Sequence, residues 1–360
     1  MLKHSYNRFF PTPAFLSQPS FGLDISDESL KYVELVNTRH GIRIGRNGER
    51  KIPPGIIESG KIKDPKQMEA ILLLLRKEVG MKSVRVSLPE GQIYLFKLRL
   101  EKAGLEHVRE AIELSLEEHI PIPAQDAIFD YQVLIEEEQY LYIQVTAIPA
   151  GILENYLSVF RDSGIWVKSF ELEGQAITRA IVKKDDMATY MIVDFGEKST
   201  GISVVSRGIV MFTSTLDIGG SSLDTMIEKN FNVKQSEAEE MKKEYGLKRN
   251  AENKEIFPVL LNSVSILRDE ISRNFLYWNT HKEENGKETP QIERILLCGG
   301  DSNLIGLAEY FSVSMKVKVS MANVWSNIVD TTEYVPEVNF KQALSFAAAL
   351  GLALGDFEND

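Results

Sequence analysis

The same arrangement of residues occurs twice in this chain, about half a chain apart, and it constrains the fold more than any other feature. In "FGLDISDESLKYVELV" (21–36), a strand ends in Asp24 and is followed by serines and a second, alternating strand. In "IVDFGEKSTGISVVS" (192–206), a strand ends in Asp194 and is followed by Gly196, hydroxyl residues and another alternating strand. Each copy continues through a turn into a third strand, "IRIGRNG" or "IVMFTSTL". The repeat predicts an α/β fold made by internal duplication; the alternative is a coincidence between two common β-hairpins.

Length, charge and cysteine content narrow the class of protein. The chain has 360 residues, 43% of them hydrophobic, so it can form two domains that each bury a core. Its formal net charge of −11 disfavours nucleic acid and direct binding to anionic lipid. The single cysteine, Cys298, excludes an internal disulfide, and no apolar run is long enough to cross a bilayer. We therefore expect a cytoplasmic protein without direct membrane insertion, with a flexible, proline-containing arm at residues 1–20.

Secondary-structure patterns divide the rest of the chain. Between the repeats, strand-like runs such as "VRVSLPEGQIYLFKLRL" alternate with helical runs such as "GLEHVREAIELSLEEHI", which predicts an inserted α+β subdomain. After the second repeat come three helical segments and "IERILLCGG", a buried strand that ends in two glycines. The expected divisions are a first subdomain at 21–84 plus 161–183, the insert at 85–160, a second subdomain at 184–224 plus 292–360, and a helical subdomain at 225–291.

Glycines and hydroxyls cluster just after the strands that end in acids. Backbone N–H groups at such turns bind phosphate oxygens, and Mg²⁺ is often held by carboxylates through water. Asp24 and Asp194 are therefore candidate Mg²⁺ residues, with the metal held through water. The Gly-Gly of "LLCGGDSN" can floor an apolar slot for adenine. Each motif alone is weak evidence, because Asp-Phe-Gly or Gly-Gly can be a simple turn, but their combination and order are more specific.

With these motifs, the chain from about residue 20 onward resembles the actin-like ATPase superfamily and, within it, the PilM family of type IV pilus assembly proteins. "FGLDISDESLKYVEL" and "YMIVDFGEKSTGISVV" resemble the first and second phosphate motifs, and "ILLCGGDSNLIGLAEYF" resembles the adenosine motif. The segment "EEHIPIPAQDAIFDYQVL" of the insert is the most diagnostic part. The resemblance implies an actin-like (ribonuclease H-like) fold, with ATP and Mg²⁺ in a cleft between two halves.

The resemblance also implies roles for individual residues. In this superfamily the Glu and Lys of an Ala-Glu-x-x-Lys helix contact the ribose, and here they are Glu239 and Lys242. Glu173, in "FELEGQAITRAI", lies where the family can orient the attacking water, although capping or solvating a helix explains this acid equally well. The full set of candidate nucleotide-binding residues is Asp24, Ser26, Ser29, Lys31, Asp194, Gly196, Ser199, Thr200, Gly219, Gly220, Glu239, Lys242, Gly299, Gly300 and Asn303.

The chain departs from the family pattern at two places. Ser26 replaces a glycine and is followed by Asp27 and Glu28, which would crowd the phosphate tail. A like-charge pair about 4 Å apart costs about 1 kcal/mol in water and about 4 kcal/mol at an intermediate dielectric constant. Asp301 stands where small residues are common after the Gly-Gly. We therefore expect ATP binding with slow or absent hydrolysis.

Two classes of function follow from the resemblance. The first is a nucleotide-binding scaffold at the cytoplasmic face of the inner membrane, docked through its insert to the cytoplasmic N-terminal peptide of a PilN-like membrane protein. The second is an enzyme of the same fold, either a sugar-kinase-like phosphotransferase or a chaperone-type ATPase. An FtsA-like filament protein is disfavoured, because that family ends in a basic amphipathic helix and this chain ends in "LGDFEND". Self-association stays open.

Overall fold

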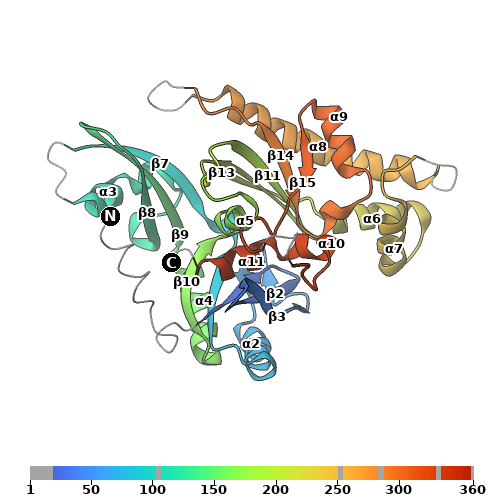
Figure 1. Cartoon of the computed structure of the whole chain (residues 1–360), viewed down its shortest axis with the longest axis horizontal. Helices are drawn as coiled ribbons and strands as arrows, with labels where there is room; N and C mark the ends of the chain where they lie inside the picture. The colour runs from blue at the N-terminus through green and yellow to red at the C-terminus, as the bar shows by residue number, and fades with distance from the viewer. Residues whose placement is uncertain (1–18, 103–106, 250–253, 283–287, 330–333, 358–360) are drawn as a thin grey trace.

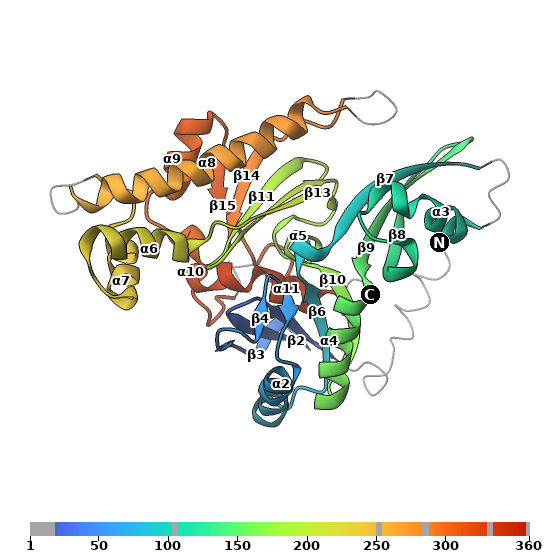
Figure 2. The same ribbon diagram turned by 180° about the vertical axis from the view of Figure 1, so that it is seen from behind.

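Two five-stranded sheets form the framework of the molecule, and the second repeats the topology of the first (Figures 1 and 2). The computed structural model describes residues 19–102, 107–249, 254–282, 288–329 and 334–357. In each sheet, an antiparallel three-stranded meander is extended on one side by two parallel strands. The internal duplication predicted from the sequence is therefore confirmed. The predicted arm at residues 1–20 falls almost entirely on residues 1–18, outside the described part of the chain.

Asp24 and Asp194 lie on equivalent central strands of the two sheets. The first sheet has the order β10-β6-β1-β2-β3, and the second has the order β15-β14-β11-β12-β13. The strands of the first sheet are β1 (Phe21–Ile25), β2 (Ser29–Thr38), β3 (Gly41–Lys51), β6 (Ser83–Leu88) and β10 (Trp166–Leu172). The strands of the second sheet are β11 (Thr189–Phe195), β12 (Thr200–Ser206), β13 (Ile209–Leu216), β14 (Arg294–Cys298) and β15 (Val319–Met321).

Helices cover the outer face of each sheet and fill the space between the sheets (Figure 1). The core of the first sheet includes residues of α2 (Pro65–Val79) and α4 (Ala150–Ser163). The core of the second sheet includes residues of α6 (Gly220–Phe231), α7 (Gln235–Tyr245), α8 (Ile256–Thr280) and α9 (Leu307–Met315). The helix α8, expected within a separate helical subdomain, thus shares the core of the second sheet. None of the helices in the described part of the chain is both long and apolar enough to cross a membrane.

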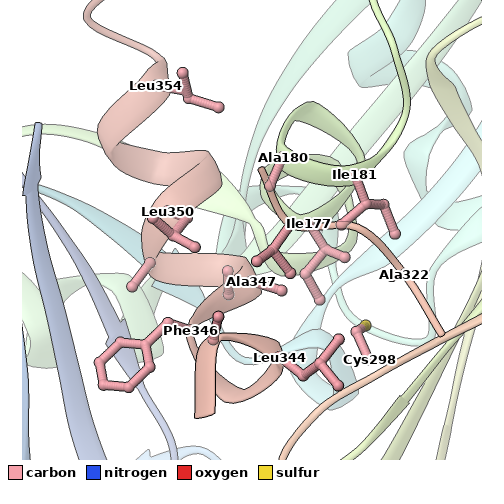
Figure 3. Close-up of a cluster of buried hydrophobic side chains, with 14 of the residues drawn as sticks. Ile177, Ala180, Ile181, Cys298, Ala322, Leu344, Phe346, Ala347, Leu350 and Leu354 are labelled. Atoms are coloured by element: carbon pink, nitrogen blue, oxygen red, sulfur yellow. The ribbon is translucent and has the colours of Figure 1, made fainter. Parts of the chain in front are cut away.

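Two central helices, α5 (Glu173–Ile181) and α11 (Ala347–Leu354), pack against each other between the sheets (Figure 3). The contact brings backbone against backbone: a Cβ atom at Gly351 would lie 1.7 Å from the carbonyl oxygen of Ala176. A Cβ atom at Gly22 on β1 would lie 1.9 Å from the carbonyl oxygen of Ala349. The small-residue run "AAALGLAL" therefore forms a buried helix that joins the two halves. Although α11 falls in the range expected for the second subdomain, it packs on the first sheet.

The insert is shorter than the range 85–160 expected from the sequence. Its body is a three-stranded sheet in the order β7-β9-β8 with the helix α3 on one face. The strand β6 belongs to the first sheet and α4 to the core of that sheet, so both ends of the expected range were placed wrongly. The elements of the insert are β7 (Tyr94–Glu101), α3 (Val108–His119), β8 (Ala127–Glu136) and β9 (Tyr140–Pro149).

The insert is connected through the chain to the first sheet, and its side chains also contact the second half of the molecule. The buried Gln144 on β9 donates a 2.6 Å hydrogen bond from Nε2 to the carbonyl oxygen of Val210 on β13. The ammonium group of Lys97 on β7 lies 5.7 Å from the ring centroid of Trp278 on α8. The insert is thus connected by the chain to one sheet and by side chains to the other.

A network of ion pairs joins the first sheet to the C-terminal segment. Arg85 on β6 donates to Glu171 on β10 and to Asp356, both at 2.9 Å. Arg179 on α5 donates to the other oxygen of Glu171 at 2.8 Å. Asp356 also accepts a 2.7 Å hydrogen bond from the backbone N–H of Ser20. Because these side chains are mostly buried, the network fixes α5 and the end of α11 on the first sheet.

Candidate functional site

Asp24 and Asp194 project from the ends of the central strands β1 and β11. Asp24 is buried and accepts a 2.8 Å hydrogen bond from the hydroxyl of Ser87. Burial raises the pKa of Asp24, while the ammonium group of Lys31 opposes the rise. Burial, together with the nearby charge of Asp24, raises the pKa of Asp194 to about 6. The two predicted metal-binding acids therefore come from different halves and act on one another.

Two further acids complete a group that we call the acid cluster: Asp24, Glu90, Glu173 and Asp194. Glu173 is the first residue of α5, hydrogen-bonds to Asp194, and has a pKa raised well above its ordinary value by burial and by the other three acids. Glu90, in the short helix η1 (Glu90–Gln92), accepts a 2.9 Å hydrogen bond from the backbone N–H of Gly174. Burial raises the pKa of Glu90 to about 7. Four carboxyl groups held this close need a bound cation or protons to be stable together.

The first predicted phosphate loop connects β1 to β2. The hydroxyl of Ser26 accepts a 3.2 Å hydrogen bond from the backbone N–H of Ser29. Lys31, opposite Asp24 in the strand pairing, donates a 2.9 Å hydrogen bond to the hydroxyl of Ser29 and lies 3.6 Å from Glu49. Ser26, Ser29 and Lys31 thus form one hydrogen-bonded group beside Asp24, and the charge of Lys31 opposes the rise in the pKa of Asp24, Glu173 and Asp194.

The second predicted phosphate loop connects β11 to β12. The backbone N–H of Gly196 donates to the carbonyl oxygen of Ser199 at 3.0 Å, which closes a tight turn. The Gly196 carbonyl oxygen accepts from the backbone N–H of Gly220, so this loop contacts the first residue of α6. The predicted residue Thr200 is buried, and its hydroxyl donates a 2.6 Å hydrogen bond to the carbonyl oxygen of Ile218. Its hydroxyl therefore stabilises the protein interior.

The two acids that follow Ser26 have different partners. Asp27 accepts hydrogen bonds from the backbone N–H groups of Ser59 and Gly60, at 2.7 and 2.9 Å, and so holds the turn between β4 (Ile57–Glu58) and β5 (Lys61–Ile62). Glu28 forms a 2.8 Å ion pair with Lys198 across the two phosphate loops. Asp27 is therefore bound by the turn between β4 and β5 rather than by the phosphate loops. The crowding of the phosphate tail is expected from Glu28 and not from Asp27.

Glycines allow close backbone contacts at the other predicted positions. Gly299 has a φ of 89°, and a Cβ atom there would lie 2.4 Å from Oδ1 of Asp194, so this site requires glycine. At Gly219 a Cβ atom would lie 2.4 Å from the carbonyl oxygen of Glu197. The end of β14 and the start of α6 therefore both approach the second phosphate loop at backbone distance, with Gly300 following directly after Gly299.

The predicted ribose-binding residues are both engaged with protein groups. Lys242 is buried on α7 and contacts three oxygens: the Gly220 carbonyl at 3.1 Å, Asp224 at 2.9 Å and Asp301 at 2.8 Å. Burial alone would lower the pKa of Lys242, but the two carboxylates outweigh it and raise that pKa. Glu239 is partly exposed and pairs with Lys243 on the same helix.

Asn303 and a large cavity lie beyond this group. Asn303 donates from Nδ2 to the carbonyl oxygens of Gly300 and Lys341, at 3.1 and 2.8 Å, and so joins the short helix η3 (Asp301–Asn303) to α10 (Phe340–Ala343). A cavity of about 850 Å³ adjoins the same turn. Its lining is mostly apolar and includes Leu247, Ser302, Asn303, Tyr310, Val313 and Phe340.

Comparison of the sequence with models of protein families identifies the family of this chain. A family model described as "Type IV pilus assembly protein PilM" matches residues 22–357. The chain belongs to this PilM family. The sequence-based assignment to the family is therefore confirmed over almost the whole chain.

Several solved structures have folds similar to that of this chain. The structure titled "PilM-PilN type IV pilus biogenesis complex" has a TM-score of 0.77 and 23% identity, covering 95% of this chain and 99% of that one. MreB5 of Spiroplasma citri bound to ADP has a TM-score of 0.58 and 16% identity, with 95% and 97% covered. The ethanolamine utilization protein EutJ from Carboxydothermus hydrogenoformans has a TM-score of 0.57 and 16% identity, with 94% and 89% covered. The predicted actin-like fold is confirmed.

Three site residues of this PilM-family protein were missed in the candidate set: Glu90, Asp224 and Asp301. Glu90 follows the strand β6, which runs parallel to β1, so the rule that found Asp24 and Asp194 applies to it as well. Asp301 was noticed as a departure from the family pattern, but its contact with Lys242 joins residues 59 positions apart. Asp224 and Lys242 come together through the packing of α6 on α7, for which the sequence has no local signal.

Proposed function

We propose that the protein is a nucleotide-binding scaffold of the type IV pilus assembly machinery. In this proposal it lies in the cytoplasm, peripheral to the inner membrane, and docks the N-terminal tail of a PilN-like membrane protein. Membership of the PilM family and the PilM-PilN title of a similar structure support the pilus role. The acid cluster, built by both halves of an actin-like fold, is the observation that carries nucleotide binding.

The residues at the acid cluster fit a nucleotide that arrives with Mg²⁺. Mg²⁺ usually keeps several waters and takes one or two carboxylates together with phosphate oxygens. No group of three His, Cys, Asp or Glu side chains in the described part of the chain is arranged to hold a metal alone, which suits a metal completed by phosphate. Asp24 and Asp194 would hold Mg²⁺ through water, Lys31 and the two loops would face the phosphates, and Mg²⁺ would neutralise the acids.

Thermal unfolding with and without Mg-ATP tests nucleotide binding. A ligand at about 100 times its dissociation constant stabilises the native state by about 2.7 kcal/mol. We expect a clear rise in the unfolding temperature of the wild-type protein and no rise for Asp194→Ala. The absence of any shift in the wild type, together with no heat of binding by calorimetry, rules out this part of the proposal.

We expect ATP hydrolysis to be slow or absent. Glu173, the candidate residue for orienting water, is hydrogen-bonded to Asp194 within the acid cluster. A phosphate-release assay on the purified protein measures turnover directly. A rate close to the enzyme median of about 10 per second would show this expectation to be wrong and would favour an ATPase or phosphotransferase.

The strand β8 offers the best surface for an extended peptide. It is an edge of the three-stranded sheet, and Ile128, Val133 and Ile135 expose 39%, 50% and 49% of their surface along it. A pocket of about 380 Å³ lies at its first residues, lined in part by Arg109 of α3 and Phe129. An edge strand with a neighbouring pocket can bind a peptide by strand addition, with the pocket selecting one side chain.

Peptide titration tests the docking function. We expect micromolar affinity, about −8 kcal/mol, for the cytoplasmic tail of the membrane protein encoded next to this gene. Val133→Asp should weaken binding at least tenfold, whereas Leu276→Asp, on the exposed face of α8, should not. Hydrogen exchange should show protection along β8. No binding of the tail, combined with transfer of phosphate to a small-molecule acceptor, would replace the scaffold by the phosphotransferase alternative.

A further inference from the structure

Lys242 is the centre of a buried charged group beside the candidate nucleotide site. Its side chain is 5% exposed, that of Asp224 is 7% exposed and that of Asp301 is 19% exposed. One cation thus faces two carboxylates, and the group carries an excess negative charge when all three are ionised. The side chains of this group depend on one another, because a buried charge that loses its partner destabilises the protein.

The carboxyl group of Asp301 fills the space directly above Gly220. A Cβ atom at Gly220 would lie 2.0 to 2.1 Å from Cγ and both carboxyl oxygens of Asp301. The same residue also contacts the second phosphate loop, because the Gly220 N–H donates to the Gly196 carbonyl oxygen at 2.9 Å. Asp301 therefore covers Gly220 beside Lys242, and it also lies near the second phosphate loop, where burial and the charges of Glu28 and Asp301 raise the pKa of Glu197 to about 6.

Lys242 has other partners that would remain if Asp301 moved. It keeps the Gly220 carbonyl oxygen and Oδ2 of Asp224. The second oxygen of Asp224, Oδ1, is buried and has no hydrogen-bond partner among the described residues. Asp224 can therefore offer Lys242 a second oxygen, which makes the Asp301 contact the replaceable one of the three.

From these contacts we propose that Asp301 is an internal competitor for the nucleoside part of the ligand, which deepens the proposed nucleotide-binding function and rests on it. In the free protein the Asp301 carboxylate occupies the surface over Gly220 and takes one contact of Lys242. A ribose that binds at Lys242, as the family resemblance implies, can reach Gly220 and Lys242 only after Asp301 has turned away. The phosphates would meet the loops themselves and need no surface on Gly220, so they are not expected to displace Asp301.

Calorimetric titration with two ligands tests this assignment. We expect Asp301→Ser to bind Mg-ATP at least tenfold more tightly than the wild type, while the affinity for Mg-tripolyphosphate changes less than twofold. Asp301→Asn keeps the shape of the side chain but not its charge. Its affinity for Mg-ATP should lie between the affinities of the wild type and of Asp301→Ser. It also serves as the second variant if Asp301→Ser fails to fold, and it should then still exceed the wild-type affinity for Mg-ATP.

The possible results separate this assignment from nucleotide binding itself. Equal or weaker binding of Mg-ATP by the folded Asp301 variants overturns the competitor role and leaves the proposed function intact. An equal gain for Mg-ATP and Mg-tripolyphosphate also overturns it, because the effect would then be general charge repulsion. No binding of Mg-ATP by wild type and variants alike, with all proteins folded, overturns the proposed function together with this inference.

Discussion

The two repeated units share their strands and differ in their loops. In both, an antiparallel meander presents an acid at the end of its first strand. The first loop contacts the turn between β4 and β5, where Asp27 accepts from Ser59 and Gly60. The second loop turns toward α6, through the hydrogen bond from Gly220 to Gly196. The strand pattern thus preserves the frame after duplication, while the loops acquire separate contacts.

Because the strands and the loops make different contacts, mutations in them should affect different properties, namely stability and ligand binding. Contacts that hold the frames together, such as those of α5 and α11, are buried and combine apolar side chains with close backbone approaches. Contacts between the loops are made by partly exposed side chains. We therefore expect large stability effects at the centre of the molecule and small ones at the loops, with ligand effects in the opposite order.

Gly351→Ala should have the largest effect on stability. The added Cβ atom would lie 1.7 Å from the carbonyl oxygen of Ala176, so α11 must move away from α5. We expect the free energy of unfolding, measured with denaturant, to fall by more than about 3 kcal/mol. Gly151→Ala in α4 is the matched control, because the added Cβ atom would meet nothing within 4 Å apart from its chain neighbours and the backbone of its own helix. Equal stability of the two variants would contradict the packing of the central helices.

Asp356→Ala should have the second largest effect. The substitution removes the acceptor of Arg85 and of the Ser20 backbone, and leaves the guanidinium of Arg85 partly buried with one acid, Glu171. We expect a loss of about 2 to 3 kcal/mol in the free energy of unfolding. Glu136→Ala, which breaks an exposed pair with Lys102 in the insert, should leave the unfolding midpoint unchanged. A result in which Asp356→Ala also leaves it unchanged would show that the network is not structural.

The sequence predicted the frame well because the frame depends on local patterns. Strand alternation and the acid at each strand end were sufficient to find β1, β2, β11 and β12. The limits of the insert were wrong because membership of a sheet depends on pairing: β6 pairs with β1 across about 60 residues. The buried group around Lys242 could not be predicted, because it depends on how α6, α7 and η3 pack.

Asp194→Asn should separate stability from ligand binding. Burial and the charge of Asp24 raise the pKa of Asp194 to about 6, so the ionised carboxylate is unfavourable in the free protein at neutral pH. A neutral side chain of the same shape should therefore stabilise the free protein by about 1 kcal/mol. Thermal unfolding measures this gain, and Mg-ATP should add nothing to it.

Asp24→Asn sharpens the comparison between the two units. Asp24 accepts from Ser87 and is attracted by Lys31, and these contacts offset part of the effect of burial. We therefore expect a smaller gain for Asp24→Asn than for Asp194→Asn. A loss of more than about 1 kcal/mol in the Asp194 variant would mean that its charge is compensated within the protein.

The smallest effect is expected at the contact that links the two loops, the ion pair of Glu28 and Lys198. These side chains are 32% and 54% exposed, so the pair should contribute only about 0.5 kcal/mol. A double-mutant cycle with Glu28→Gln and Lys198→Met measures this coupling free energy. The pair of Arg273 and Glu270, within the single helix α8, is the matched control.

The informative measurement is the same cycle in saturating Mg-ATP. If phosphate lies between the loops, it competes with Glu28 for Lys198, and the coupling between these two residues should fall toward zero. The coupling within α8 should not change, because no part of the proposed ligand reaches it. An unchanged Glu28–Lys198 coupling in protein that demonstrably binds Mg-ATP would place the phosphates away from these loops. The two units would then share a frame without sharing the ligand.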